Sequence, residues 1–423
     1  MQDKYSKIFF LKEFLERREE ICMSKLKEFL KKEVVLTVAL LLAVVSMFIV
    51  KPDEEYINYI DFSTLGILFC LMAVMAGLQR MGVFREIAEA LLSKVQKTWQ
   101  IVLILVMLCF FFSMMITNDV ALITFVPFTF IILDLLGKEA EKKLLIPVVV
   151  LQTIAANLGS MLTPIGNPQN LYLFGKAEMG IGEFILLLLP YTVAAFLLLT
   201  GCCILLGRSG SKESGRSGSV KGSSSESETA DGQGQGAMQK FEGMTKRTSL
   251  QGGVWDVVRY LILFALALLT VAKIVPFEVT LAVTVVTMLL FDRKLFGKID
   301  YSLLLTFVGF FVFIGNMGRV DAFREFLQGI INGNEVLTAV VSSQVISNVP
   351  AALLLSGFTG ETEALIIGTN LGGLGTLIAS MASLISYKYI AKGNRCKKGA
   401  YFAYFTVANV VFLAILLGMW VLL

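Results

Sequence analysis

The chain has 423 residues, of which 56% are hydrophobic and 17% are charged, and its mean hydropathy is +0.75. A water-soluble globular chain of this length does not need so many apolar residues to fill one core, so the composition indicates a membrane protein. The formal net charge is only +4, and the absence of His removes the usual neutral-pH proton carrier and the commonest transition-metal ligand.

The first 33 residues carry nine Lys or Arg and seven acidic residues, a pattern that does not predict a cleaved signal peptide. Apolar residues recur there at helical spacing, which predicts an amphipathic helix in residues 1–33 at the cytoplasmic membrane surface. The residues of this stripe are Ile8, Leu11, Leu15, Cys22, Leu26 and Phe29.

Nine apolar segments are long enough to cross about 30 Å of hydrocarbon, which takes about 20 residues as a helix. They predict an all-α polytopic protein with about nine crossings and discontinuous helices at the midplane. The segments are 34–50, 62–79, 144–175, 183–206, 255–273, 276–292, 301–318, 364–390 and 399–423.

Lys and Arg in short loops set the expected orientation, because such loops stay in the cytoplasm. Cationic loops at 80–98, 137–143, 293–298 and 388–398 are placed inside, opposite acidic loops. We therefore expect a multi-pass plasma-membrane protein with a cytoplasmic N-terminus and, after nine crossings, an external C-terminus.

Residues 207–253 are rich in Gly and Ser, and we expect a disordered cytoplasmic linker because such a segment cannot bury enough apolar surface to fold. The linker separates a first transmembrane repeat, 34–206, from 254–423, which holds one extra span and a second repeat. None of the six cysteines has a CxxC spacing, so neither a disulfide framework nor a transition-metal site is indicated.

The two repeats resemble each other in several blocks that keep the same order. IDFSTLGILFCLMAVMAGL (60–78) matches IDYSLLLTFVGFFVFIGNM (299–317), and NLGSMLTPIGNPQNL (157–171) matches NLGGLGTLIASMASL (370–384). The extra span 255–273 inverts the second repeat relative to the first. Inverted repeats favour a secondary transporter over a channel, a receptor or a membrane enzyme.

Each repeat also contains a polar interruption between two apolar arms. In the second repeat the arms 336–346 and 350–358 are too short to span the bilayer separately, which predicts a re-entrant hairpin at 336–358. The duplication extends this interpretation to a hairpin near 100–136, although its arms could each span alone.

The hairpin tips and the start of each polar break supply the predicted cation ligands, because carbonyl, Asn and Ser oxygens suit Na⁺ and backbone groups at the midplane need partners. Na⁺ is the expected ion at Asn118 and Asn348; the alternative is that these polar residues only cap broken helices. The predicted ligands are Thr117, Asn118, Asp119, Asn157, Ser347, Asn348 and Asn370.

Asp119 is the one acidic residue deep in an apolar segment, and its matched position in the second repeat is Val349. An intramembrane carboxylate is costly and is a functional candidate by default. Three roles remain open for it: a cation ligand, a proton carrier, or a cap of the helix that follows.

The two polar breaks, 157–171 and 370–384, are expected to line the substrate site, since irregular backbone at this depth is tolerated only where it lines a cavity. No Lys or Arg lies well inside any span, and Arg80 and Arg319 are interpreted as solvated residues at the interface. The predicted substrate contacts are Thr163, Pro164, Gly166, Asn167, Pro168, Gln169, Asn170, Gly375, Thr376, Ser380 and Ser383.

These motifs resemble the ion transporter superfamily, specifically the citrate-transporter-like permeases related to divalent anion/sodium symporters and arsenite-efflux permeases. In the anion symporters each hairpin tip reads Ser-Asn-Thr, whereas the tips here read Thr117-Asn118-Asp119 and Ser347-Asn348-Val349. The resemblance implies one Na⁺ per half with a carboxylate substrate between them, a homodimer, and an elevator-type motion of the site.

The expected function is secondary active transport of small di- or tricarboxylate-like anions, coupled to Na⁺ or H⁺. The expected surroundings and partners are membrane lipid, the anion and a second copy of the chain, with no cofactor and no nucleic acid. The alternatives are a cation/proton antiporter, an arsenite-type efflux permease, and a channel or efflux subunit driven by a separate ATPase, since the chain has no Walker motif.

Overall fold

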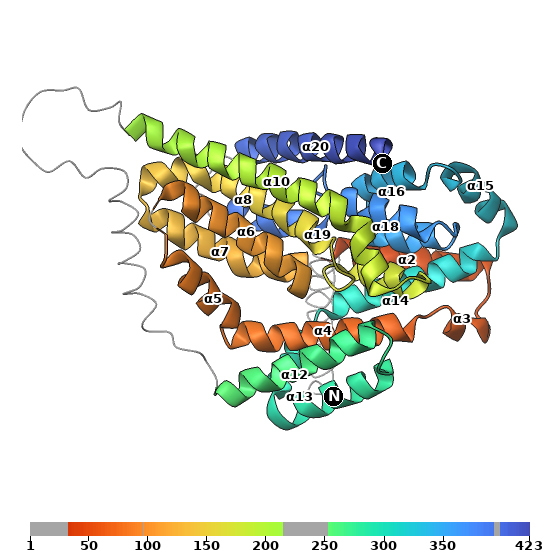
Figure 1. The fold of residues 1–423 in the computed structure, drawn as a ribbon. Helices are drawn as coiled ribbons and strands as arrows, with labels where there is room; N and C mark the ends of the chain where they lie inside the picture. The colour runs from red at the N-terminus through yellow and green to blue at the C-terminus, as the bar shows by residue number, and fades with distance from the viewer. Residues whose placement is uncertain (1–32, 96, 215–252, 393–397) are drawn as a thin grey trace, which may run out of the picture. The chain divides into compact units, whose positions relative to one another are not determined.

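The computed structural model describes residues 33–95, 97–214, 253–392 and 398–423, and within these ranges all regular secondary structure is helical (Figure 1). The predicted surface helix in 1–33 and most of the predicted linker lie outside the described residues. The linker was expected to begin at residue 207, but helix α10 continues to Ser214.

The helices of the first repeat follow one another with short connections. They are α2 (Val34–Ile49), α3 (Glu55–Asn58), α4 (Phe62–Arg80), α5 (Val83–Leu92), α6 (Thr98–Ile116), α7 (Asn118–Leu135), α8 (Lys138–Ser160), α9 (Pro168–Lys176) and α10 (Ile181–Ser214).

The second part begins with the extra span and then repeats the same order. Its helices are α12 (Val254–Val271), α13 (Phe277–Phe291), the 3₁₀ helix η1 (Arg293–Lys298), α14 (Tyr301–Gly318), α15 (Asp321–Ile331), α16 (Glu335–Ile346), α17 (Asn348–Ser356), α18 (Thr362–Leu371), α19 (Met381–Lys392) and α20 (Lys398–Leu422).

Eight described helices are long and apolar enough to cross a membrane, namely α4, α6, α7, α8, α10, α12, α14 and α20. The all-α polytopic fold is therefore confirmed. The set differs in detail from the nine predicted crossings, because α2 and α13 have only 16 and 15 residues and both arms of the first hairpin reach spanning length. The predicted spans 144–175 and 364–390 are discontinuous, as expected, because α8 is followed by α9 and α18 by α19.

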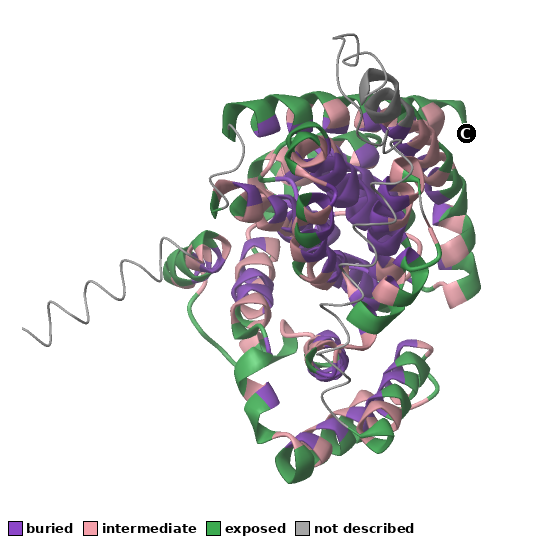
Figure 2. Cartoon of the chain, turned by 90° about the vertical axis from the view of Figure 1, so that its left-hand side faces the viewer, coloured by how far each residue is buried: buried purple, intermediate pink, exposed green. Residues whose placement is uncertain are grey.

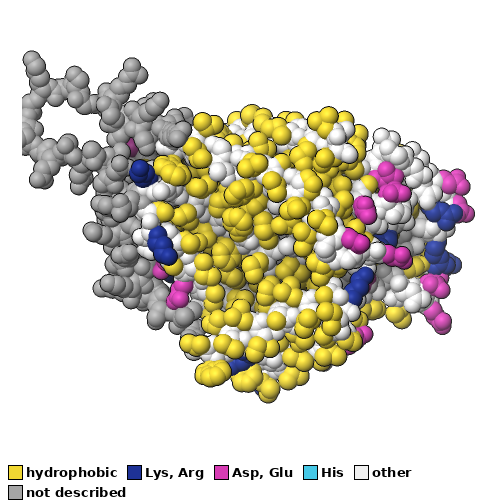
Figure 3. Space-filling view, viewed as in Figure 1, with side chains coloured by type: hydrophobic (Ala, Val, Ile, Leu, Met, Phe, Trp, Pro, Cys, Tyr) yellow, Lys and Arg dark blue, Asp and Glu magenta, His cyan; other side chains and the backbone are white. Residues whose placement is uncertain are grey.

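The larger of two compact units contains residues 61–299 and 321–423. Within it α6, α7, α8 and α10 pack side by side (Figure 1). Buried residues gather in the middle of this helix cluster (Figure 2), and 83% of the most apolar stretch of α8 is buried, compared with 22% for α20. Hydrophobic side chains cover the outer face over α10 and α20 (Figure 3), as a lipid environment requires.

The smaller unit comprises residues up to 60 together with 300–320, and in it α2 packs against α14. In the larger unit α4, the counterpart of α14, packs against α12 and α13. Each of these matched helices therefore finds its partner in the other half of the sequence, so the two halves exchange helices.

The matched segments 60–78 and 299–317 begin their helices in the same way. Asp61 accepts a hydrogen bond from the backbone N–H of Thr64 at 2.9 Å, and Asp300 accepts one from that of Leu303 at 3.0 Å. Both are N-caps, which satisfy backbone donors that the first helical turn leaves without partners. The duplication thus extends to local structure.

The same two helices end on matched ion pairs. Arg80, at the end of α4, contacts Asp292 at 2.5 Å, and Tyr260 donates a hydrogen bond to the same carboxylate at 2.7 Å. Arg319, after α14, contacts Asp53 at 2.6 Å. Arg80 and Arg319 are 41% and 44% exposed, and each is paired; their place at the membrane interface stays a prediction.

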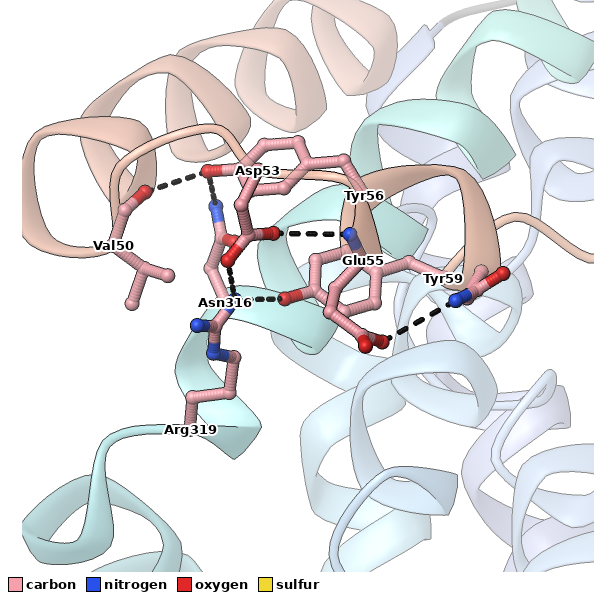
Figure 4. A network of polar contacts seen from close by, with 8 residues as sticks. Val50, Asp53, Glu55, Tyr56, Tyr59, Asn316 and Arg319 are labelled. Carbon is pink, nitrogen blue, oxygen red and sulfur yellow. Dashed lines mark hydrogen bonds and ion pairs between the residues drawn. The ribbon is translucent and has the colours of Figure 1, made fainter.

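The Arg319 pair belongs to a polar network within the smaller unit (Figure 4). Arg319 also donates to the Tyr59 hydroxyl at 3.0 Å. Asn316 donates to the Tyr56 hydroxyl at 2.8 Å, and Tyr56 in turn donates to the carbonyl of Val50 at 2.6 Å. This network fixes the connection after α2 to the end of α14.

Gly77 of α4 lets the buried Tyr260 ring of α12 approach, because an added Cβ would lie 2.4 Å from that ring. We predict that Gly77→Val displaces Tyr260 from Asp292 and destabilises the fold by about 1–3 kcal/mol, as overpacking does. Thermal unfolding in detergent measures this. Gly201→Val is the matched control, since no atom lies within 4 Å of a Cβ added there, and an equal effect of both substitutions would contradict the prediction.

Candidate functional site

Both predicted hairpin tips are single residues in a backbone conformation that L-amino acids rarely adopt. Thr117 joins α6 to α7 with φ 76° and ψ 147°, and Ser347 joins α16 to α17 with φ 75° and ψ 154°. This region is nearly restricted to Gly and costs about 1–3 kcal/mol per residue. Since the same strained geometry occurs at matched positions, the surrounding contacts must hold it in both halves.

Each tip is held by the polar break that follows it in the sequence. The backbone N–H of Asn118 donates to the carbonyl of Gly166 at 3.2 Å, and that of Asn348 donates to the carbonyl of Ala379 at 2.9 Å. Gly166 and Ala379 occupy matched positions in the two breaks. The first backbone donor of each returning helix is thus satisfied by unwound backbone.

A threonine reinforces each of these contacts. The hydroxyl of Thr163 donates to the carbonyl of Met114 at 2.5 Å, and that of Thr376 donates to the carbonyl of Gln344 at 3.1 Å. Met114 and Gln344 each lie three residues before their tip. Both threonines were predicted to contact substrate, which stays a prediction, and in the structure their hydroxyls donate to the first arm of each hairpin.

The tip asparagines are buried and serve partly as caps. The side-chain oxygen of Asn118 accepts from the N–H of Asp119 at 2.9 Å, and that of Asn348 accepts from the N–H of Val349 at 3.0 Å. The Asn118 amide group also donates to the side-chain oxygen of Asn157 at 3.0 Å. Asn118 therefore both satisfies a backbone donor in the first turn of α7 and contacts Asn157, and its role as a cation ligand stays a prediction.

Asn157 connects the first hairpin to the second break. Its side-chain oxygen also accepts from the Ser380 hydroxyl at 2.9 Å, and its amide group donates to the carbonyl of Gly373 at 3.3 Å. Every member of this network is buried. The structure thus brings a predicted cation ligand and a predicted substrate contact together.

A second set of contacts connects the breaks from the other side. Asn370 donates to the side-chain oxygen of Asn170 at 2.7 Å, and Asn167 donates to the Ser160 hydroxyl at 2.7 Å. A longer contact of 3.5 Å joins Asn167 to the side-chain oxygen of Asn370. Asn167, Asn170 and Asn370, predicted from two separate motifs, therefore lie together.

The remaining predicted substrate contacts act mainly through the backbone. Pro164 and Pro168 are buried, and Pro168 is the first residue of α9, a position that suits its missing N–H. Gly375 has φ 111°, and Thr376 next to it is exposed. These residues contribute to the shape of the breaks, and their contact with substrate stays a prediction.

Four buried side-chain polar atoms in these breaks have no hydrogen-bond partner among the described residues. They are both amide atoms of Gln169, the oxygen of Asn167 and the hydroxyl of Ser383. Buried polar groups are almost always paired, so these atoms are available to a bound species. Gln169 lies in the first turn of α9 and Ser383 in that of α19.

Asp119 is half-buried in the first turn of α7, where the partial positive charge of the helix N-terminus favours a carboxylate. Ala121 donates its backbone N–H to the carbonyl of Thr117, so α7 is regular directly after the tip. This placement is compatible with each of the three predicted roles.

Gln344 was not predicted from the sequence, yet its side-chain amide contacts the second break at several points. Its signal was a long amide side chain inside the apolar arm 336–346. Ser113 and Ser343 were also missed; they face Gly159 and Gly372 so closely that a Cβ on either glycine would lie 2.6 Å from a serine hydroxyl.

Comparison with known proteins decides the family. A family model described as citrate transporter matches residues 25–361. The chain belongs to the citrate transporter family. The prediction of a citrate-transporter-like permease is thereby confirmed, and this chain is a multi-pass membrane transporter and not an enzyme.

Individual relatives agree with this assignment. An uncharacterized transporter of Methanocaldococcus jannaschii is 30% identical over 351 residues, which cover 82% of this chain and 85% of the relative. The inner membrane protein YbiR of Escherichia coli is 26% identical over 349 residues, covering 81% and 84%. The silicon efflux transporter LSI3 of rice, Oryza sativa subsp. japonica, is 31% identical over 147 residues, covering 34% and 29%.

The two backbone acceptors at the tips, Gly166 and Ala379, differ in whether a side chain fits at that position. Substitutions at these two matched positions can therefore be compared. A Cβ on Gly166 would lie 2.1 Å from the carbonyl oxygen of Ser160, whereas the matched residue Ala379 already carries one. We predict that Gly166→Ala shifts the first break, weakens the Asn118–Gly166 bond and costs about 1–3 kcal/mol.

Thermal unfolding and transport in proteoliposomes check this prediction. Ala379→Gly is the control, and we expect it to cost no more than about 1 kcal/mol through added backbone freedom. A Gly166→Ala variant as stable and active as the wild type would show that the first break does not need its observed backbone path.

Proposed function

We propose that this transporter moves small anions by secondary active transport coupled to Na⁺ or H⁺. The observation that carries the proposal is the matched docking of each hairpin tip on an unwound helix, with Asn118 and Asn348 in equivalent places. Two equivalent broken-helix sites related by an inverted repeat are the architecture of a coupled carrier.

The chemistry of the breaks supports an anion that is balanced by a cation. Residues 157–171 and 370–384 contain no Lys and no Arg, so the chain itself offers no fixed positive charge there. An anion in such a place needs a compensating charge, since an uncompensated charge at membrane depth is costly. A co-bound cation supplies it and couples the two fluxes.

The unpartnered amide of Gln169 and hydroxyl of Ser383 suit a substrate whose groups both accept and donate hydrogen bonds. Ionised carboxylates accept hydrogen bonds, and the hydroxyl group of a hydroxy acid such as citrate also donates one. The N-terminus of α9 adds backbone donors that favour negative charge.

The proposal includes the setting of the protein. We propose a plasma-membrane location with the N-terminus in the cytoplasm and the C-terminus outside, as the loop charges favour. We also propose a homodimer whose sites move as an elevator. Accessibility of single cysteines introduced near each terminus tests the orientation, because only external thiols react with an impermeant reagent in whole cells.

Uptake of labelled citrate, succinate and sulfate into proteoliposomes, under separate Na⁺ and H⁺ gradients, tests the function. We expect accumulation of at least one anion against its gradient. Accumulation under one gradient identifies the coupling ion, and no accumulation under either would overturn the proposal.

We predict that the double variant Asn118→Ala, Asn348→Ala loses gradient-driven uptake by at least about tenfold, because a hydrogen bond in a buried network is worth roughly 1.4 kcal/mol or more when a partner is removed. The variant must still unfold cooperatively in detergent and elute as the wild type does. Normal uptake with normal cation dependence would remove both residues from the site.

A cation/proton antiporter is the second candidate, and the half-buried carboxylate of Asp119 at the first tip favours it. The rice relative is named a silicon efflux transporter, which supports outward movement of a small solute as a variant of the same mechanism. In cation/proton antiport and in solute efflux alike, the Asp119 carboxyl would be the group that binds and releases the proton.

We predict for this candidate that Asp119→Asn abolishes exchange driven by a pH gradient, since an amide cannot carry the proton. Fluorescent pH indicators inside proteoliposomes measure it, and Asp134→Asn, at the far end of α7, is the control. Exchange that survives Asp119→Asn would eliminate Asp119 as the proton carrier.

A further inference from the structure

Gln344 of α16 holds the second broken helix with its side chain. Its amide nitrogen donates to the carbonyls of Gly372 and Leu374, each at 2.9 Å, and its amide oxygen accepts from the backbone N–H of Thr376 at 2.8 Å. These partners fix the orientation of the amide, because carbonyls can only accept and a backbone N–H can only donate. One side chain therefore satisfies both kinds of unwound backbone group.

The second break has a glycine, Gly375, next to the Gln344 side-chain amide. Gly375 has φ 111°, and a Cβ added to it would lie 2.2 Å from the Gln344 side-chain oxygen. A larger residue is excluded both by the backbone conformation and by the contact. Gln344 and Gly375 thus form a complementary pair across the break.

The first half lacks both members of this pair. The residue three positions before the tip is Met114, and the counterpart of Gly375 is Leu162, five positions after Asn157. The methionine side chain has no N–H to donate, and Leu162, unlike Gly375, carries a side chain at its position. Because both residues of the pair are replaced in the first half, the halves differ in this contact as a whole.

The side-chain contacts to the carbonyls of the first break are longer, and the carbonyl of Thr163 also accepts from the backbone N–H of Gly166 at 3.3 Å. The carbonyls of Ser160, Met161 and Thr163 accept from the Asn170 side chain at 3.4, 3.3 and 3.3 Å. These distances exceed the 2.9 Å contacts made by Gln344 and lie beyond the usual range for N–H···O bonds. The first tip also carries the acidic Asp119 where the second has Val349.

Unwound carbonyls in broken helices are the groups with which such carriers hold a coupling cation. An amide N–H that already occupies the carbonyls at 2.9 Å performs the same electrostatic task with a partial positive charge. We propose that the Gln344 amide takes the place of a cation at the second break, so that each protomer binds a single coupling Na⁺, at the first break. This inference rests on the proposed coupled transport and specifies its stoichiometry.

Hydrogen–deuterium exchange of the full-length protein in detergent tests the two breaks separately. Na⁺ is compared with choline at constant ionic strength, and exchange is followed in peptides from 157–171 and 370–384. We expect Na⁺ to slow exchange in the first segment and to leave the second unchanged. Slower exchange in 370–384, or no Na⁺ effect in either segment, would overturn the inference.

The variant Gln344→Met gives the second half the residue of the first. We expect amide exchange in 372–376 to become about tenfold faster or more, as the loss of one or two hydrogen bonds implies, while the Na⁺ effect on 157–171 persists. Val341→Met, on the exposed side of the same helix, is the control and should change neither segment. Unchanged exchange in 372–376 of the Gln344 variant would contradict the assignment.

The outcomes separate this inference from the proposed function. Uptake driven only by H⁺, with no Na⁺ effect on exchange, leaves coupled transport intact and rejects the single Na⁺ site. No uptake under either gradient rejects coupled anion transport, and the wild-type exchange data then still decide whether Na⁺ binds at the first break alone.

Discussion

The site depends on one constraint, which is that unwound backbone deep in the protein must find hydrogen-bond partners without water. The backbone of each hairpin tip hydrogen-bonds to the unwound backbone of a broken helix, so that each provides a partner for the other. The Asn118 N–H pairs with the Gly166 carbonyl, and the Asn348 N–H pairs with that of Ala379. The strained residues Thr117 and Ser347 persist because these contacts hold the helices on both sides of them.

The halves use the same backbone contacts but fill the space around them differently. The second break receives the amide of Gln344, whereas the matched positions of the first half hold Met114 and Leu162, and its tip carries Asp119. Duplication thus conserves the path of the chain and leaves the chemistry of each half free to diverge.

The helix breaks could be located from the sequence because Asn, Pro and Gly inside an apolar segment interrupt a spanning helix and bring polar groups to membrane depth. The predicted tips, 117–119 and 347–349, include the residues at which the structure joins the helices, Thr117 and Ser347. The role of Gln344 could not be predicted, because a side chain that reaches across a break leaves no periodic signal. The linker was predicted to begin too early, since α10 extends to Ser214 despite the Gly and Ser there.

The exchange of helices between halves has a consequence for how the chain is made. Helix α2 is complete once residue 49 has emerged, yet its partner α14 begins at residue 301, and α4 likewise waits for α12 and α13. During synthesis, at about 5–20 residues per second, α2 remains without its partner for roughly 10–50 s. Helices α2 and α4 must therefore wait in the membrane without these partners, even though α6, α7, α8 and α10 can already pack together.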